Sequence, residues 1–483
     1  MGRALHILHG NCKEKEGFNM KISYAFIFYL IFSLFSFIAL KVSGAKILTY
    51  LIFTAVMLIT AGFALTNRKR IVFMLLLVNS YLVLPKMFLL SVVWILPGFL
   101  ISFLFLKKID TETRIAIGLV LSLSLILFSV LLSYLGIPIS RMLMILIFSS
   151  PLMLLLNKKV RDDFEELFNS QPDYKKLSLI IVVITFILLV YSPFFNEKAL
   201  PQTTAVEYYS AARYVERVLS EQKNFPIWEV KNTLGQARYT LDAPAYFWFS
   251  GISAFILGRN ALFIYNQAFI FLIIVSAVFL FLTFKRISSN NLLSLMITFL
   301  FFSFPTIGAA VGASGNMKGF AALCIGSLSL YFLVMLVNKK NVLYFFMLFL
   351  LGGIAVLFHP VALYIIMGVM ISALLSLEKK HFVSWKFWSV LCLISMVFMF
   401  WIVPFFHYSY RVTQNLGASM SINFPEYVRE NLAFMGLSIL LMLILLYFLI
   451  TKKGKLHYNL VWLVPFLLLV VYSLDSTKFP ILN

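Results

Sequence analysis

Charged residues, and acids above all, are scarce in this chain of 483 residues. Only 12% of the residues are Asp, Glu, Lys or Arg, and just 19 are acidic. A soluble globular domain holds about 25% charged residues, so this composition excludes an ordinary soluble protein. Apolar residues fill the difference: 61% of the chain is hydrophobic and the mean hydropathy is +0.95. This excess predicts an integral membrane protein, because lipid is the solvent that accepts it.

Cysteine and nucleotide-binding motifs are also missing or nearly so. The three cysteines, Cys12, Cys324 and Cys392, have neither metal-site nor disulfide spacing. Neither the dinucleotide-binding motif GxGxxG nor the P-loop motif GxxxxGK(S/T) occurs in the sequence. Their absence argues against the use of a cytosolic nucleotide sugar. The formal net charge of +21 does not indicate nucleic acid, because the basic residues form short runs between apolar stretches. Such runs are typical of loops at an anionic membrane surface.

The apolar runs predict an all-α, polytopic transmembrane protein of about 15 spans, since one span needs about 20 apolar residues. The single candidates are 22–40, 47–65, 114–134, 141–156, 177–193, 261–283, 292–308, 319–337, 342–357, 361–377, 387–405, 433–451 and 458–474. The stretch 71–106 is too long for one span. Because Pro85-Lys86 interrupts it, we expect a hairpin of two short helices there.

Pairs of basic residues predict the orientation. They are Arg68-Lys69-Arg70, Lys107-Lys108, Lys158-Lys159, Lys175-Lys176, Lys285-Arg286, Lys339-Lys340, Lys379-Lys380 and Lys452-Lys453. All of them face the cytoplasm, as the positive-inside rule requires, only if the short segment 243–257 does not cross. We therefore expect a multi-pass protein of the cell membrane with a cytoplasmic N-terminus. Its large outer loops are 194–260 and about 406–432.

The same pattern predicts the domains. Residues 1–21 form a polar tail in which Met20 is a candidate initiator, and 22–156 form an N-terminal membrane module of about six spans. The charged segment 157–176 is the predicted cytoplasmic linker. Residues 177–405 form a membrane core, and 406–483 hold an outer loop and two final spans.

Acids are absent from every predicted span, which counts against ion-coupled transport because intramembrane acids mark ion pathways. Nine acids face outward in this topology. They are Glu197, Glu207, Glu216, Glu221, Glu229, Asp242, Glu426, Glu430 and Asp475. Acid–base or metal chemistry on the outer face has to use these few.

The first outer loop contains a predicted amphipathic helix that lies on the membrane surface. Its apolar positions, Tyr208, Ala212, Val215 and Leu219, recur at helical spacing. The stretch from Thr204 to Glu207 also fits a capping box, in which Glu207 would bind the backbone at the start of the helix. Glu207 is therefore either a helix cap or a catalytic residue.

Three motifs of this loop together resemble the first outer loop of GT-C glycosyltransferases, polytopic enzymes that use polyprenyl-phosphate sugars. They are Glu207-Tyr208-Tyr209, Pro226-Ile227-Trp228 and the segment 242–248. The resemblance implies that Glu207 is the catalytic base, in place of the more usual Asp, and that 243–257 is a non-crossing helix. The stretches 305–320 and 352–365 also resemble this superfamily, although Gly315-Asn316-Met317 stands where the family carries acids.

The resemblance implies further site residues, several of which have a structural alternative. Arg213, Arg238 or Lys318 would hold the lipid phosphate, and His359, Tyr410 and Arg411 would contact substrate. Asp242 would be a metal ligand if the enzyme uses a divalent cation such as Mg²⁺ or Mn²⁺. The alternatives are that Asp242 is a helix N-cap, that Lys318 and His359 lie in plain turns, and that Tyr410 and Arg411 are interfacial anchors.

The implied partners are membrane lipid, a polyprenyl-phosphate-linked sugar and an acceptor glycan, lipid or protein; no nucleic acid is expected. Two other functions stay open. One is a flippase for lipid-linked oligosaccharides or another membrane transporter. The other is a non-catalytic scaffold with the GT-C fold, which the missing acids around Asn316 would fit.

Overall fold

All regular secondary structure in the described part of the computed structural model is helical, as predicted. The structure describes residues 28, 31–40, 47–65, 78, 85–105, 109–169, 173–191, 202–224, 245–303, 317–358, 362–377, 381, 383–396 and 398. Contacts divide the chain into two compact units, residues 1–88 with 162–192, and residues 89–161 with 193–483. This division differs from the predicted one, because residues 89–156 pack with the later core. The predicted linker is itself helical over α8 (Lys158–Asn169).

The first unit is described over helix 31–40, α2 (Ile47–Leu65) and α9 (Tyr174–Val190). Aromatic contacts join its two sequence segments, since the ring centroid of Phe28 lies 5.6 Å from that of Tyr174. α9 begins at Asp173, whose carboxylate accepts the backbone N–H of Lys176 at 3.1 Å. An Asp in this position satisfies one of the free N–H groups at a helix start.

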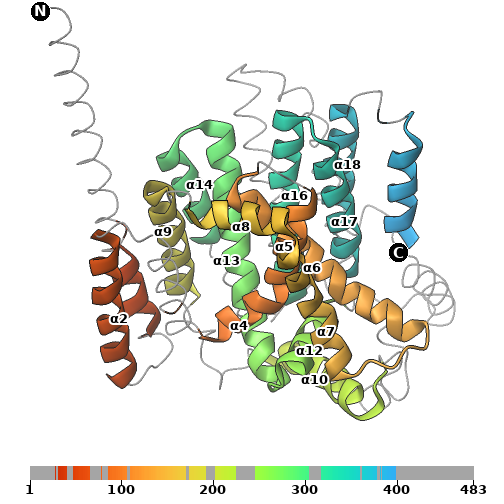
Figure 1. Ribbon diagram of the computed structural model, residues 1–483, viewed down its shortest axis with the longest axis horizontal. Helices are drawn as coiled ribbons and strands as arrows, with labels where there is room; N and C mark the ends of the chain where they lie inside the picture. The colour runs from red at the N-terminus through yellow and green to blue at the C-terminus, as the bar shows by residue number, and fades with distance from the viewer. Residues whose placement is uncertain are drawn as a thin grey trace, which may run out of the picture. The chain divides into compact units, whose positions relative to one another are not determined.

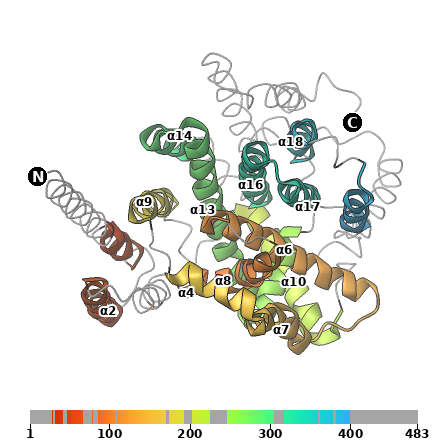
Figure 2. The same ribbon diagram turned by 45° about the horizontal axis from the view of Figure 1, so that its top comes forward.

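Apart from α8, which runs from the second unit into the first, the other helices labelled in Figure 1 lie in the second unit. In chain order they are α4 (Pro85–Trp94, which begins in the first unit), α5 (Leu96–Phe105), α6 (Thr111–Tyr134), α7 (Arg141–Ser149), the 3-10 helix η1 (Ser150–Leu156), α10 (Gln202–Gln222), α12 (Ala245–Leu257), α13 (Ala261–Ser288), α14 (Asn291–Ser303), α16 (Met317–Lys339), α17 (Val342–Phe358) and α18 (Ala362–Ser376). Figure 2 shows α16, α17 and α18 side by side, seen nearly end-on.

α13 is the centre of this unit. It packs against α16, α14 and α12, and apolar residues all round its circumference are buried. A helix that is apolar on every face belongs in a core. Where α13 meets α16, Phe279 and Tyr331 form an edge-to-face pair with their ring centroids 5.1 Å apart.

Small residues bring α5 and α6 into backbone contact. A side-chain carbon on Gly118 would lie 2.9 Å from the backbone nitrogen of Phe99, and one on Gly98 would overlap the backbone of Gly118. The N–H of Gly98 donates to the hydroxyl of Ser122 at 2.9 Å. Helices approach this closely where glycine and serine replace larger side chains.

In the segment 71–106 a helix begins at Pro85, where the sequence predicts the interruption, and a further break lies at Ile95. Pro85 begins α4, where the missing proline N–H costs no hydrogen bond. The described break is at Ile95, between α4 and α5. Trp94 precedes it, is fully buried, and donates its indole N–H to the hydroxyl of Ser253 in α12 at 2.7 Å.

Two described helices are long and apolar enough to cross a membrane by themselves, Thr111–Ser133 and Gln267–Ser288. A third candidate combines Arg141–Leu156 with Lys158–Leu167, which meet at a bend of 92°. Seven further apolar helices are shorter. The predicted spans 433–451 and 458–474 lie outside the described residues, and the count of about 15 spans stays a prediction.

Candidate functional site

Polar groups gather at the two ends of α6 and α13, and the apolar middle of both helices separates them. One group surrounds Asp110, at the start of α6 and the end of α13. The other surrounds α10, at the end of α6 and the start of α13. We call these the Asp110 end and the α10 end. α6 has 24 residues and α13 has 28, so at 1.5 Å per residue the helices are about 36 and 42 Å long.

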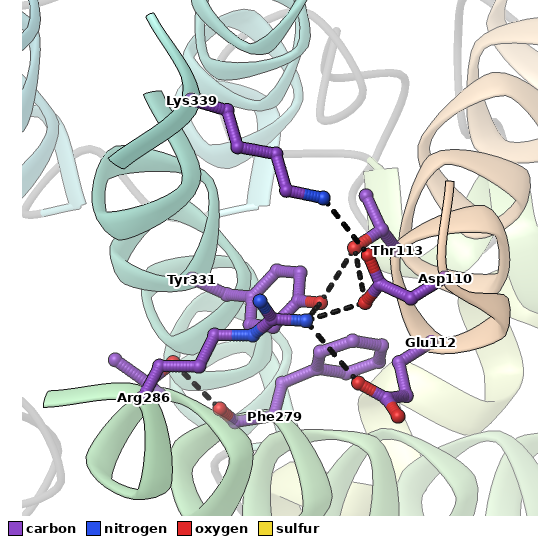
Figure 3. Close-up of polar contacts among 8 residues, drawn as sticks. Asp110, Glu112, Thr113, Phe279, Arg286, Tyr331 and Lys339 are labelled. Carbon is purple, nitrogen blue, oxygen red and sulfur yellow. Dashed lines mark hydrogen bonds and ion pairs between the residues drawn. The ribbon is translucent and has the colours of Figure 1, made fainter. Parts of the chain in front are cut away.

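The Asp110 end contains a charged cluster of six residues from three helix termini (Figure 3). They are Asp110, Glu112 and Thr113 at the start of α6, Arg286 near the end of α13, and Tyr331 and Lys339 in α16. The Asp110 carboxylate is the main acceptor. It receives hydrogen bonds from the guanidinium of Arg286, from Thr113 Oγ1 at 2.9 Å and from Lys339 Nζ at 3.2 Å.

Arg286 connects the remaining members of the cluster. Its Nη2 donates to the hydroxyl of Tyr331 at 3.1 Å and lies 3.3 Å from Glu112 Oε2. The guanidinium carbon also lies 5.2 Å from the Tyr331 ring centroid, within the range of a cation–π contact. The Tyr331 hydroxyl in turn lies 2.8 Å from Thr113 Oγ1.

The electrostatics of the cluster follow from the helix ends that meet there. Acids are favourable at the start of a helix and bases at its end, because of the partial charges on the free backbone groups; Asp110 and Arg286 obey this rule. Burial by itself would raise the pKa of Asp110. The charge of Arg286, the hydrogen bond from Thr113 and the contact with Lys339 outweigh it, and together they lower this pKa below its ordinary value of 3.8.

At the α10 end, side chains bind backbone groups of a turn. The turn connects α12 to α13, and the half-buried Glu216 of α10 accepts the N–H of Ala261 there at 3.1 Å. The hydroxyl of Tyr209 donates to Asn260 at 3.4 Å. Burial raises the pKa of Glu216, although the Ala261 hydrogen bond and the charge of Arg213 oppose the shift.

α10 is amphipathic, as predicted. Ala212, Val215 and Leu219 are fully buried, whereas Arg213 and Arg217 are exposed. The buried face lies against Gly251 of α12, where an added side-chain carbon would come within 2.9 Å of the Ala212 carbonyl oxygen. The fit of α10 on α12 therefore depends on the absence of a side chain at one position.

The end of α12 is capped by backbone groups and by an arginine from α7. Gly258 has a φ of +61°, and the next N–H, of Arg259, donates to the Ala254 carbonyl at 3.0 Å; this is a Schellman-type end. Arg141 Nε donates to the Ile256 carbonyl at 3.2 Å. The guanidinium lies against Gly258, where a side chain would collide with it.

Few of the predicted site residues fall in the described part. Glu207 lies in α10, but this helix begins at Gln202, so Thr204 is inside the helix and the predicted capping box is wrong. Arg213 is exposed on α10, and Lys318 is the second residue of α16. Arg238, Asp242, His359, Tyr410 and Arg411 lie outside the described residues.

Neither Glu216 nor the charged cluster was predicted as a site. Arg286 and Lys339 were treated only as topology markers, and Asp110 follows another such marker, Lys107-Lys108. The position of Asp110 beside a basic run is visible in the sequence, but the sequence does not show which distant basic residues it meets. Within the described residues no three His, Cys, Asp or Glu side chains are grouped to hold a metal ion.

No protein-family model, curated protein or solved structure matches this chain. The resemblance to GT-C glycosyltransferases therefore stays a prediction that rests on the motifs of the first outer loop.

Proposed function

We propose that this chain is a multi-pass membrane glycosyltransferase that transfers a sugar from a polyprenyl-phosphate carrier to an acceptor on the outer face. The main observation in support of a membrane location is the distance between the two polar ends. The helices between them are about 36 and 42 Å long, and a bilayer has a hydrocarbon core of about 30 Å. Each polar end would then lie at one membrane surface.

The charges support an orientation for this proposal. Arg286 and Lys339, from two of the predicted cytoplasmic pairs, meet at the Asp110 end. They come from loops about 50 residues apart in the chain, yet they share one carboxylate. By the positive-inside rule the Asp110 end faces the cytoplasm and the α10 end faces outward.

The short helix α12 agrees with this topology. It has 13 residues, or about 20 Å at 1.5 Å per residue, and is too short to cross the hydrocarbon core. It packs against α10, and both helices contact the start of α13. A non-crossing α12 keeps the basic pairs before and after it on the same side of the membrane.

The chemistry follows from the position of Glu207 on an amphipathic helix at the outer surface. The Glu207 carboxylate removes the proton from an acceptor hydroxyl or amide as a general base. The acceptor oxygen or nitrogen forms the new bond to the anomeric carbon of the sugar. The bond from that carbon to the phosphate oxygen breaks, and its electron pair leaves with the lipid phosphate. Arg213, one of the exposed cations of the same helix, stabilises the charge of this leaving group.

The experiment is sugar transfer in membrane vesicles from a panel of labelled polyprenyl-phosphate sugars. Glu207→Gln should reduce kcat by a factor of about 100 or more, the usual effect of losing a general base. Glu221→Gln is the matched control, because Glu221 is an exposed acid of the same helix that pairs with Arg217 on the helix surface. It should retain most of the transfer.

The other outcomes separate the alternatives. Equal transfer by wild type and Glu207→Gln would support the enzyme proposal but would reject Glu207 as the base. If folded wild type transfers no sugar from any member of the panel, the enzyme proposal is wrong. Protein-dependent movement of a labelled carrier across the vesicle membrane would then favour a flippase.

A further inference from the structure

We propose that Arg141 and the exposed apolar face of α7 form a binding site for an anionic phospholipid of the outer leaflet. The guanidinium would bind the lipid phosphate, and one acyl chain would lie along the helix. This proposal rests on the membrane part of the proposed function and is independent of sugar transfer.

Arg141 occupies an electrostatically unusual position. It is the first residue of α7, where the partial positive charge of the helix start disfavours a cation. It is exposed, and its hydrogen bond to the Ile256 carbonyl uses only Nε. In the described part of the chain no carboxylate pairs with Arg141, so the two Nη groups can meet an anion from outside the protein.

The surroundings of Arg141 are also positive. Arg259 adjoins Gly258, against which the Arg141 guanidinium packs. Lys223 is exposed, and its backbone carbonyl accepts the N–H of Ile139 close to the start of α7. Glu216, an acid next to this turn, is half-buried and accepts the Ala261 N–H. An arginine fork in a positive field fits a phosphate, which it can bind through two parallel hydrogen bonds.

Directly after Arg141, α7 presents an exposed apolar face. Met142, Ile145 and Leu146 are exposed by 64%, 41% and 53%, and their spacing brings them onto one side of the helix. The opposite side holds Met144 and Phe148, which are buried. A cation at one end of an exposed apolar face matches an amphiphile, with a phosphate head at one end and a hydrocarbon chain below it.

The size of this face favours a glycerophospholipid. α7 has nine residues, or about 14 Å of helix, which is close to half of the hydrocarbon core of about 30 Å. A chain confined to one leaflet therefore covers the exposed side chains of α7. The charge of Arg141 favours an anionic lipid such as phosphatidylglycerol over zwitterionic phosphatidylcholine.

The test is a titration of the purified full-length protein in detergent, read as the shift in thermal unfolding. Phosphatidylglycerol should raise Tm in a saturable way, and phosphatidylcholine and glycerol phosphate should not. In Arg141→Gln the half-saturating lipid concentration should rise about tenfold, as expected from the loss of one charge-assisted contact. The control Arg217→Gln, which removes an exposed cation from α10, should change it less than about twofold.

Three results would overturn the proposal. They are equal stabilisation by phosphatidylcholine, stabilisation by glycerol phosphate alone, or an unchanged phosphatidylglycerol affinity in Arg141→Gln. If Arg141→Gln fails to fold because it loses the contact with α12, the double variant Met142→Ser with Leu146→Ser decides. This variant retains Arg141 and should still weaken the lipid effect; an unchanged effect would refute the site. None of these measurements depends on sugar transfer. The lipid-site proposal can therefore be refuted or supported independently of the enzyme proposal.

Discussion

The two ends of α6 and α13 are stabilised by different kinds of contact. At the Asp110 end, side chains from three helix termini bind one another, and charge is the common element. At the α10 end, side chains such as Glu216 and Arg141 bind backbone groups, and the helices fit through a glycine. One end therefore depends on charge and the other on shape.

The difference has a structural cause. Asp110, Arg286 and Lys339 lie at or next to helix ends with opposite partial charges, so ion pairs and helix dipoles reinforce one another. At the α10 end the chain turns between α12 and α13, and backbone groups need partners there. Substitutions at the two ends should therefore lower the stability for different reasons, which experiments can distinguish.

The largest expected effect is at Gly251. Gly251→Ala puts a carbon 2.7 Å from Val215 Cγ1 and 2.9 Å from the Ala212 carbonyl oxygen, so α10 has to move. We expect a loss of about 2 to 3 kcal/mol in unfolding free energy, the upper part of the range for overpacking, measured by unfolding in detergent. Among the described residues, the control Gly352→Ala meets only Ile366 Cγ2, at 3.1 Å, and should cost little. Equal losses in both variants would show that α10 packing is not tight.

The next effect is at the charged cluster. Asp110→Asn removes the charge that Arg286 and Lys339 share and should cost about 1 to 2 kcal/mol, because a charged donor loses its charged acceptor. Glu112→Gln affects only the contact of 3.3 Å with Arg286 and should cost less. If added salt lowers the unfolding free energy of wild type but not that of Asp110→Asn, the contribution of Asp110 is electrostatic. The ranking of the two variants is wrong if Glu112→Gln is the more damaging.

The two ends should respond to pH in opposite directions. The pKa of Asp110 is lowered in the folded protein, so its contribution is present above the ordinary value of 3.8 and is lost as the pH falls below it. The pKa of Glu216 is raised, so its contribution is present below the ordinary value of 4.5 and is lost as the pH rises through the folded pKa. When Tm is measured between pH 3 and 7, wild type should therefore lose stability at the acid end. This loss should be absent in Asp110→Asn. The Tm of wild type should also decline as the pH rises above 4.5, and this decline should be absent in Glu216→Gln. Identical profiles for wild type and both variants would contradict these shifts.

The smallest effect is at the surface pair of α10. Arg217 and Glu221 lie 2.8 Å apart but are each 56% exposed. Arg217→Ala should change the unfolding free energy by less than about 0.5 kcal/mol. A much larger loss would mean that Arg217 has a role beyond this pair.

Local elements were more predictable than contacts between them. The predicted span 47–65 coincides with α2, and the amphipathic helix of the first outer loop is α10, because hydrophobic periodicity is a local property. The break at Ile95 was not predicted, although Pro97 follows two residues later and removes a helical hydrogen bond there. The packing of Trp94 on α12 could not be predicted because it is a long-range contact. The cluster at Asp110 was missed for the same reason. Its members are up to 229 residues apart in the chain, and nothing in a single sequence pairs them.

The most direct test asks whether the two ends lie on opposite sides of the membrane. Single cysteines are introduced at Ser220, exposed on α10, and at Asn338, exposed near the Asp110 end, after Cys12, Cys324 and Cys392 have been replaced by serine. Intact cells are treated with a membrane-impermeant maleimide before and after permeabilisation. We predict that Ser220→Cys reacts in intact cells and that Asn338→Cys reacts only after permeabilisation. Labelling of both positions from the same side would contradict the proposed topology and, with it, the outer-face site.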